Sequence, residues 1–206
     1  MIEAINITKA FNNEAVVSDF NIKINEGDFV AITGESGKGK TTILNMLGLL
    51  EKPDYGEIKV EGVSNLNKKQ IMMAQRHKFG YLFQNYALIE NETVEDNLKI
   101  ALEFKKGAKK QTEMKEALHF VNLNSSILKK KIYQLSGGEQ QRVAIARLYL
   151  KESDYIFADE PTGNLDTKNR DVVFDLLKKL NAQGKAVIFV THDLELAQKA
   201  PIWINL

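Results

Sequence analysis

Short apolar runs recur along the chain between polar, turn-forming residues. The longest of them, each typical of a strand buried on both faces, are 29–33, 79–83, 155–160 and 186–191. Nearer the N-terminus, residues 2–8 alternate between apolar and polar side chains, and 21–24 and 57–60 are strand-like segments beside turn signals. The pattern predicts an early antiparallel β portion within an α/β chain.

Segments with helical periodicity separate these runs. They cover residues 40–50, 67–76, 94–104, 111–121, 140–150 and 168–182. From about residue 86 to residue 134 the helical pattern dominates, with Met114, Leu118 and Val121 on one face. The stretch 143–146 is apolar on all sides, so we expect the helix that contains it to be buried.

The composition is that of an ordinary globular protein. Hydrophobic residues make up 44% of the 206 positions and charged residues 27%, and the formal net charge of +1 gives no sign of a nucleic-acid footprint. The chain has no cysteine, which excludes disulfides and Cys-based metal sites. No apolar run approaches the ~18 residues of a membrane span, and the start lacks a signal-peptide pattern. We therefore expect a cytoplasmic domain without a nucleic-acid partner.

Lysines crowd the predicted helical part of the chain. They are Lys105, Lys106, Lys109, Lys110 and Lys129 to Lys131. A solvated helical surface is the simpler interpretation. Contact with lipid head groups of a nearby membrane is the alternative.

A glycine-rich segment follows the apolar run 29–33 and fits the P-loop pattern G-x-x-x-x-G-K-[ST]. It reads Gly34, Glu35, Ser36, Gly37, Lys38, Gly39, Lys40 and Thr41, and Thr42 continues it into the next helix. Glycines let backbone N–H groups curl around phosphates, Lys40 supplies a positive charge, and the Thr41 hydroxyl can bind Mg²⁺. A strand before the loop and a helix after it complete the context of a nucleotide site, whereas a plain glycine turn with a solvated lysine is the alternative.

A second glycine-containing segment, Leu135 to Arg142, precedes the buried helix. Ser136 is a good N-cap, and Glu139 three residues later completes a capping box. A capped helix after a glycine turn is the structural interpretation. The functional one is a second phosphate site, since a hydroxyl, Gly137 and Gly138 stand at a helix N-terminus.

Polar residues follow two of the buried strands. The strand 155–160 ends in Asp159 and Glu160, and His192 follows directly after the strand 186–191. Buried carboxylates are costly without partners, so Mg²⁺ for Asp159 and a water for Glu160 would explain both. Sites in open α/β sheets collect at the carboxyl ends of strands, which favours a functional His192, whereas His77 and His119 have no such support.

Together these segments resemble the ATP-binding-cassette (ABC) ATPases. The P-loop, Gln84, 135–140, 156–160, 164–166 and His192 occur in the order found in that family, over essentially the whole chain. The segments around Gln84 and at 161–166 are most similar to the branch of lipoprotein-release and macrolide-exporter ATPases. The short length further resembles ATPases of bacteriocin exporters in that branch.

The resemblance implies the fold and its division. We expect a single α/β P-loop NTPase domain over residues 1–206, with a RecA-like parallel-sheet core and an N-terminal antiparallel β portion. The catalytic core would comprise residues 1–85 and 155–206. An inserted α-helical subdomain, residues 86–154, would carry the family's signature segment, here residues 136–139.

The resemblance also implies roles for the residues of the nucleotide site. Residues 34–42 would hold the phosphates of ATP, and Thr41, Gln84 and Asp159 would bind Mg²⁺. Glu160 would be the general base, with Gln84 sensing the attacking water and His192 contacting the γ-phosphate.

The resemblance also implies residues that would contact a second copy of the chain or the adenine ring of ATP. Ser136, Gly137, Gly138 and Glu139 would close on ATP bound by a second copy, and Asp166, beside Asn164, would cross the dimer interface. Phe11 would stack on adenine, with an ordinary core position as the alternative. Lys38 departs from the family, which usually has Ser or Ala there, and adds a charge beside the phosphates.

The function implied is that of an ATP-hydrolysing motor subunit. It would form a head-to-tail homodimer on MgATP and drive export or membrane extraction through a separate membrane permease. The permease would dock on the segment after Gln84, including Tyr86, Leu88 and Ile89, together with the helical part to about residue 128. The place of the motor subunit would be the cytoplasmic face of the membrane. Mechanical signalling to an envelope enzyme stays open. DNA-repair relatives usually carry coiled coils or zinc modules and ribosome-acting ones two cassettes, and this chain has neither feature.

Overall fold

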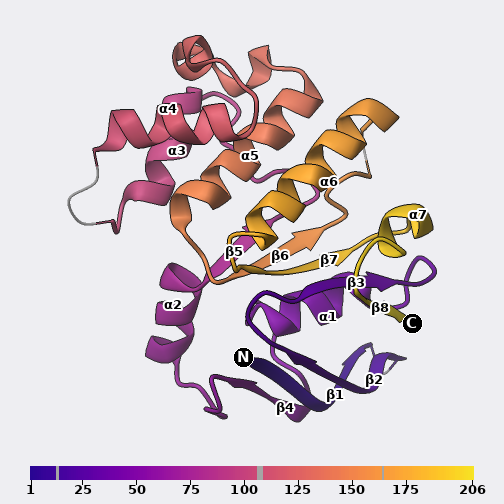
Figure 1. Cartoon of the computed structure of the whole chain (residues 1–206). Helices are drawn as coiled ribbons and strands as arrows, with labels where there is room; N and C mark the ends of the chain where they lie inside the picture. The colour runs from indigo at the N-terminus through magenta and orange to yellow at the C-terminus, as the bar shows by residue number, and fades with distance from the viewer. Residues whose placement is uncertain (13, 106–108, 164) are drawn as a thin grey trace.

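The polypeptide is layered around a parallel β-sheet in the computed structural model, which describes residues 1–12, 14–105, 109–163 and 165–206. Helices α5 (Gly137–Lys151) and α6 (Thr167–Asn181) lie above the sheet in Figure 1. Helix α1 (Lys40–Leu47) lies below it, between the parallel sheet and a smaller antiparallel sheet. Lys106 and Asn164, both singled out from the sequence, lie outside the described residues.

The central sheet has five strands in the order β5-β6-β7-β3-β8. Their bounds are Phe79–Leu82 for β5, Tyr155–Asp159 for β6, Ala186–Val190 for β7, Phe29–Thr33 for β3 and Ile202–Asn205 for β8. All neighbouring pairs in the sheet are parallel, so the carboxyl ends of the strands meet at one edge. That edge receives the P-loop after β3, Gln84 after β5, Glu160 after β6 and His192 after β7.

The antiparallel portion predicted near the N-terminus is present. Strand β1 (Ile2–Phe11) lies between β2 (Glu14–Ile24) and β4 (Tyr55–Val60). The first two strands are longer than the sequence pattern predicted, because they continue as a hairpin in which Phe11 pairs with Glu14. Alternation of exposed and buried residues is irregular there, and the pairing contains register shifts.

The remaining helices are short and gather mostly between residues 94 and 134. They are α3 (Val94–Lys99), η1 (Ile100–Leu102), α4 (Lys110–Phe120), η2 (Ser125–Lys129) and η3 (Ile132–Gln134), with α2 (Lys68–His77) and α7 (Leu194–Ala197) elsewhere. The predicted helix 94–104 thus divides into an α and a 3₁₀ segment. Helix α1 ends at Leu47, three residues before its predicted end, because Gly48 caps it and Leu49 has a positive φ.

Two hydrophobic cores hold the layers together. Strand β3 serves both: Phe29 and Ala31 pack with the helices above the sheet, and Val30 and Ile32 pack with α1 and the antiparallel sheet. The first core runs from the sheet through α5 into α3 and α4, so the helical part is continuous with the sheet. The predicted burial of 143–146 is confirmed, since none of these residues is more than 1% exposed. The division of the chain after residues 85 and 154 stays a prediction.

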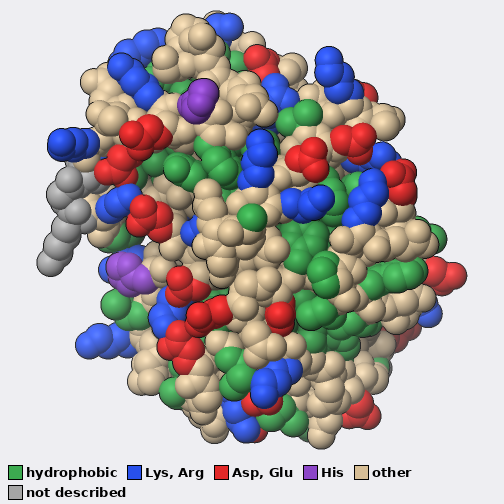
Figure 2. Space-filling model, in the orientation of Figure 1, with side chains coloured by type: hydrophobic (Ala, Val, Ile, Leu, Met, Phe, Trp, Pro, Cys, Tyr) green, Lys and Arg blue, Asp and Glu red, His purple; other side chains and the backbone are tan. Residues whose placement is uncertain are grey.

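Charged side chains on the helical surface lie close to opposite charges. Lys99 lies 2.9 Å from Glu95, and Lys105 lies 2.8 Å from Glu113. Figure 2 shows blue and red side chains interspersed over the visible face. This pairing agrees with the solvated-surface interpretation, and lipid contact stays a prediction. Among the described residues, every helix is too short or too polar to cross a membrane.

Candidate functional site

A pocket of about 510 Å³ lies at the carboxyl edge of the parallel sheet. It is lined by Val16, Ser36, Gly37, Gly39, Lys40, Thr41, Thr42, Gln84, Glu160, Gly163 and His192. The structure therefore brings together P-loop residues, Gln84, Glu160 and His192, which come from four separate parts of the sequence. Val16 was not predicted from the sequence, because a lone valine in an irregular strand carries no signal of its own.

The P-loop has the curled backbone that a phosphate cradle needs. Gly37 and Gly39 have φ angles of +84° and +81°, values that side chains other than glycine rarely adopt. A Cβ at Gly39 would lie 2.7 Å from the carbonyl oxygen of Val16, so the loop also requires glycine for space. Lys40 Nζ donates 2.9 Å hydrogen bonds to the carbonyl oxygens of Gly34 and Glu35, which holds the ammonium across the loop.

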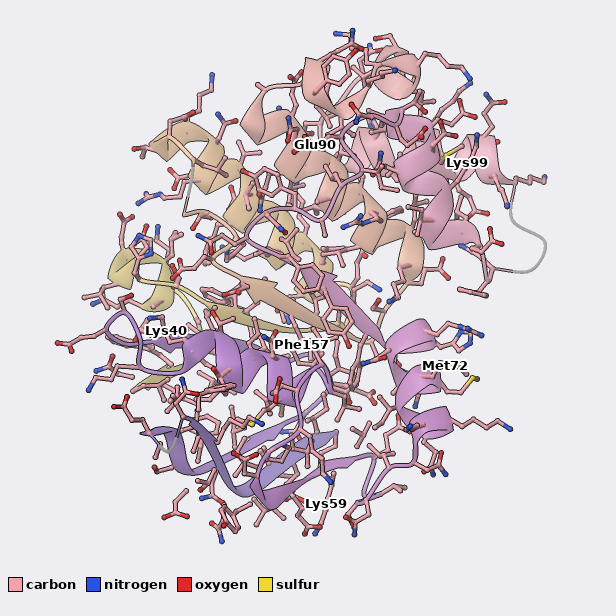
Figure 3. All side chains as sticks on the ribbon, turned by 180° about the vertical axis from the view of Figure 1, so that it is seen from behind. Lys40, Lys59, Met72, Glu90, Lys99 and Phe157 are labelled. Carbon is pink, nitrogen blue, oxygen red and sulfur yellow. The ribbon has the colours of Figure 1, made fainter. Side chains whose placement is uncertain are left out.

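Lys40 begins helix α1, whose N-terminal end faces the loop, as Figure 3 shows from behind. The positive end of the helix dipole and the ammonium thus favour an anion in the same place. Gly39 is the N-cap, and because glycine has no side chain, the first amides of the helix have no side-chain capping partner. The segment can therefore offer both backbone donors and charge to a phosphate. Glu35, Ser36 and Lys38 are exposed, and of these three Ser36 lines the pocket.

Thr41 and Asp159 form an oxygen-rich pair at the start of α1 and the end of β6. Thr41 Oγ1 donates to Asp159 Oδ1 over 3.0 Å. Burial raises the pKa of Asp159, while the Thr41 hydrogen bond and the charge of Lys40 oppose that rise. A hydroxyl and one carboxylate are hard ligands that fit Mg²⁺, which in nucleotide sites takes few protein ligands and binds substrate phosphates as well. Among the described residues, no group of three or more His, Asp or Glu side chains could form a metal cage instead.

Glu160 and His192 face each other from neighbouring strands. His192 Nδ1 lies 2.9 Å from Glu160 Oε2. The Glu160 side chain is 15% exposed and that of His192 is 68% exposed. Glu160 has a φ of +44°, and its N–H donates to the carbonyl oxygen of Val190 over 3.1 Å, so β7 fixes the turn that aims the carboxylate into the pocket.

Gln84 reaches the pocket from the segment that leads into the helical part. The next residues have unusual backbone angles, with φ of +64° at Tyr86 and +47° at Ala87. Arg147 of α5 holds both, because its guanidinium donates to the carbonyl oxygens of Tyr86 at 2.8 Å and Ala87 at 2.6 Å. The position of Gln84 is thereby tied to the helix that begins with the signature segment.

The signature segment forms the predicted capping box at the start of α5. Ser136 Oγ accepts from the Glu139 N–H at 3.4 Å, and the Ser136 N–H donates to Glu139 Oε2 at 2.9 Å. The Ser136 hydroxyl also donates to Glu139 Oε2 over 2.9 Å, and the bonds that this carboxylate accepts, first from the backbone N–H and then from the hydroxyl of Ser136, lower the pKa of Glu139. No residue from 136 to 139 is among the described residues that line the pocket at the sheet edge. The N-terminus of α5 is thus separate from the N-terminus of α1 at the P-loop.

Asp166 caps helix α6 and bonds to a residue that sequence reasoning missed. Its carboxylate accepts from the backbone N–H of Asn169 at 3.0 Å and from Asn169 Nδ2 at 2.6 Å. Asn169 Oδ1 accepts from Arg142 Nη1 on α5 at 3.0 Å. The only signal available was that Asn169 stands three residues after a helix-capping aspartate.

Phe11 lies at the end of β1 and is 47% exposed. Its exposure excludes the alternative of an ordinary core phenylalanine. The ammonium of Lys9 lies 5.5 Å from the centre of its ring. Phe11 is not among the residues that line the pocket, so adenine stacking stays a prediction for a ring beside the site.

A second, larger concavity of about 710 Å³ lies between α2, the segment after β5, η1 and the end of α5. Exposed apolar side chains in it are Met72, Ile100 and Phe104, and basic ones include Arg76 and Lys151. Arg76 stacks on Phe104 with its guanidinium carbon 3.9 Å from the ring centre. We call this feature the α2–η1 groove; Met72 marks its α2 side in Figure 3.

Comparisons with known proteins agree with this geometry. A family model described as "ABC transporter" matches residues 17–163. The ABC transporter ATP-binding protein MJ0796 of Methanocaldococcus jannaschii is 39% identical over 96% of this chain and 89% of its own length. The lipoprotein-releasing system ATP-binding protein LolD of Aquifex aeolicus is 38% identical over 96% of this chain and 90% of its own length.

Longer proteins and solved structures are also similar. The macrolide export ATP-binding/permease protein MacB of Pectobacterium atrosepticum is 37% identical over 100% of this chain but only 33% of its own length. A dimeric post-hydrolysis structure of the MJ0796 cassette, bound to ADP and Pi, superposes on all of this chain with a TM-score of 0.90 and 38% identity. A second dimeric MJ0796 structure superposes on this chain with a TM-score of 0.89.

Proposed function

This chain belongs to the ABC transporter family as an ATP-binding cassette of the LolD, MacB and MJ0796 type, and on that premise we propose that it is the ATP-driven motor subunit of an exporter. Its family, its α/β P-loop fold and its ATP hydrolase activity, all expected from the sequence, are confirmed by these matches. The more specific subgroup of bacteriocin exporters stays a prediction.

The observation that carries the proposal is the gathering of Lys40, Thr41, Glu160 and His192 around one pocket. The carboxylate of Glu160 is positioned as a general base, which takes a proton from water as that water attacks the terminal phosphate. His192 orients this carboxylate through the 2.9 Å contact. Lys40 and the amides of the P-loop hold the phosphates in place.

Mg²⁺ would be held by Thr41 and Asp159, whose oxygens are already hydrogen-bonded to each other. When bound, the ion supplies positive charge that offsets the negative charge developing on the phosphate oxygens. Gln84, exposed at the rim of the same pocket, would complete this group.

The site is proposed to be completed by a second copy of the chain. Ser136 and Glu139 lie outside the pocket that contains Lys40, yet they offer an anion the N-terminus of a 15-residue helix. In a head-to-tail pair, the signature segment of each copy would close on the ATP of the other. The dimeric state of the similar MJ0796 cassette supports this arrangement.

The membrane subunit is proposed to dock in the α2–η1 groove. Exposed Met72, Ile100 and Phe104 are suited to receive an apolar helix, and exposed apolar patches mark protein–protein sites. Ala87 also lines the groove, three residues after Gln84, so a docked segment would touch the chain that leads to the catalytic pocket. The docking region expected from the sequence, which extends from the segment after Gln84 to about residue 128, includes Ile100 and Phe104 of this groove. Within that region Leu88 packs partly against the helical core, and Ile89 is 51% exposed.

We place the chain at the cytoplasmic face of a membrane, where ATP is available, with export or membrane extraction as the work performed. The test of the motor is the rate of ATP hydrolysis per chain as the protein is diluted. A head-to-tail dimer predicts that this rate falls steeply below the dimerisation constant. A rate that stays flat on dilution would contradict the dimer. Copurification of a membrane permease, and ATPase stimulation by it, tests the transport role separately.

A further inference from the structure

Asn169 links two motifs that are far apart in the sequence. It is the third residue of helix α6. On one side, Asn169 Nδ2 donates to Asp166 Oδ2 at 2.6 Å, and on the other side its Oδ1 accepts from Arg142 Nη1 at 3.0 Å. Arg142 lies on α5, six positions after Ser136, so a continuous polar connection joins the signature helix to Asp166.

The orientation of this amide is fixed by its two partners. A guanidinium only donates, so the oxygen of Asn169 must face Arg142. A carboxylate only accepts, so the amide nitrogen must face Asp166. Both bonds involve a charged group, which makes them stronger than bonds between neutral groups. In the described part of the chain, Arg142 Nε is buried without a hydrogen-bond partner, so Asn169 is important for holding this guanidinium.

The signature glycine Gly138 packs directly on the same side chain. A Cβ at Gly138 would lie 2.7 Å from Asn169 Oδ1 and 2.8 Å from its Cγ. Helix α5 therefore approaches α6 as closely as it does because residue 138 lacks a side chain. A movement of the signature end of α5 would press on Asn169 and pull on Arg142 at once.

We propose that Asn169 is a positioning residue that couples the two ATP sites of the dimer. The inference rests on the proposed head-to-tail dimer, in which the signature segment of one copy closes on the ATP of the other. Closure at the signature moves Arg142 and Gly138, and Asn169 passes that movement to Asp166 at the dimer interface. ATP bound at one site thereby sets the position of Asp166 toward the second site.

The variants that test this coupling are Asn169→Ala and Asn169→Leu in the full chain. Alanine leaves space and leucine fills it, but both remove the amide, so an effect that they share reports the lost hydrogen bonds. Asn124→Ala is the matched control, because the Asn124 side chain also forms a hydrogen bond at the start of a helical segment, as the N-cap of η2, but does not line the nucleotide pocket. Urea unfolding of each variant separates loss of stability from loss of coupling.

We expect both Asn169 variants to bind ATP with a dissociation constant within about two-fold of the wild type, since the P-loop is untouched. Their kcat should fall by roughly ten-fold, within the range of coupling between sites, and the Hill coefficient for ATP should fall to one. Asn124→Ala should keep the wild-type Hill coefficient even where its stability is lowered. A purely structural role for Asn169 would move stability without changing the Hill coefficient.

Glu160→Gln, made as a separate variant in which hydrolysis is slowed, tests the dimer independently of the Asn169 variants. If Glu160→Gln forms an MgATP-dependent dimer and the Asn169 variants hydrolyse ATP with wild-type cooperativity, the coupling role is overturned while the proposed function stands. If Glu160→Gln remains a monomer with bound MgATP, the dimer fails and the coupling role fails with it. A reduced Hill coefficient in both Asn169 variants, with the dimer still formed, supports the inference.

Discussion

Glu160 Oε2 lies 2.9 Å from His192 Nδ1, although 31 positions of sequence separate the two residues. Strands β6 and β7 are neighbours in the parallel sheet, and each side chain follows the end of its strand. An ionised carboxylate only accepts hydrogen bonds, so a Glu160 that acts as a base requires the proton of this contact to be on Nδ1 of His192. The imidazole thus fixes the direction of the carboxylate in the nucleotide pocket.

Replacing His192 by alanine should slow hydrolysis while leaving ATP binding close to normal. The carboxylate of Glu160 would lose the partner that orients it, and a small misplacement of a catalytic group costs on the order of 10²-fold in rate. Steady-state ATPase assays should show the loss in kcat rather than in KM. His119→Ala, an exposed histidine on α4, is the matched control and should hydrolyse ATP at the wild-type rate. Equal rates for the two variants would remove His192 from the mechanism.

Replacing Gly39 by alanine should abolish the P-loop geometry. Gly39 has a φ of +81°, and a Cβ there would clash with the carbonyl oxygen of Val16 at 2.7 Å. Gly27→Ala is the control, since Gly27 has a φ of +80° but open space around its Cβ position. The control should lose only about 1–2 kcal/mol of stability from backbone strain. We expect Gly39→Ala to lose more and to bind ATP at least ten-fold more weakly in a fluorescence titration. The account of Gly39 is contradicted if both variants bind ATP alike.

The charge of Glu139 should contribute to stability in a pH-dependent way. Hydrogen bonds from the backbone and hydroxyl of Ser136 lower the pKa of Glu139. A lowered folded pKa means that this contribution is present above the unfolded pKa and is lost as the pH falls through the folded value. Urea unfolding should therefore show the wild type as more stable than Glu139→Gln at neutral pH, with the difference shrinking in acid. If the stability difference between the wild type and Glu139→Gln instead grew as the pH fell, this account of Glu139 would be contradicted.

A charge placed in the α2–η1 groove should block docking of the membrane subunit without harming the ATPase. Ile100 is 50% exposed in the groove, and Ile100→Glu would put a carboxylate where an apolar helix is expected. Tyr133→Glu is the control, because Tyr133 is 58% exposed on the same helical part but outside the groove. Both variants alone should hydrolyse ATP normally. Copurification with the permease should fail for Ile100→Glu only. If Ile100→Glu still copurified with the permease, the docking site would have to lie outside the groove.

Most of the parallel sheet could be predicted from the sequence because its strands are buried on both faces. Their apolar runs are uninterrupted, and the bounds predicted for β3 match the structure, whereas β6 ends at Asp159, one residue before its predicted end. Strand β8 was not predicted. Its residues alternate between half-buried and exposed at the edge of the sheet, so its pairing with β3 is a tertiary contact that the local pattern does not contain.

Residues of the candidate site could be predicted where their type and their spacing in the sequence match what phosphate binding or catalysis requires. The P-loop and the strand-end residues Glu160 and His192 belong to this class, and the structure brings them together in one pocket. Asn169 and Arg142 could not be predicted, because they lie on different helices and are 27 positions apart in the sequence. Such a contact depends on how closely α5 and α6 pack, which in turn depends on Gly138.

The central claim is that MgATP joins two copies of this chain through the pocket and the signature segment. Light scattering on size-exclusion fractions of Glu160→Gln, with and without MgATP, tests it most directly. Loss of the general base should slow hydrolysis by roughly 10²-fold or more and so trap the ATP-bound state. The account predicts a monomer without nucleotide and a dimer with MgATP. A variant that binds MgATP and remains a monomer would contradict it.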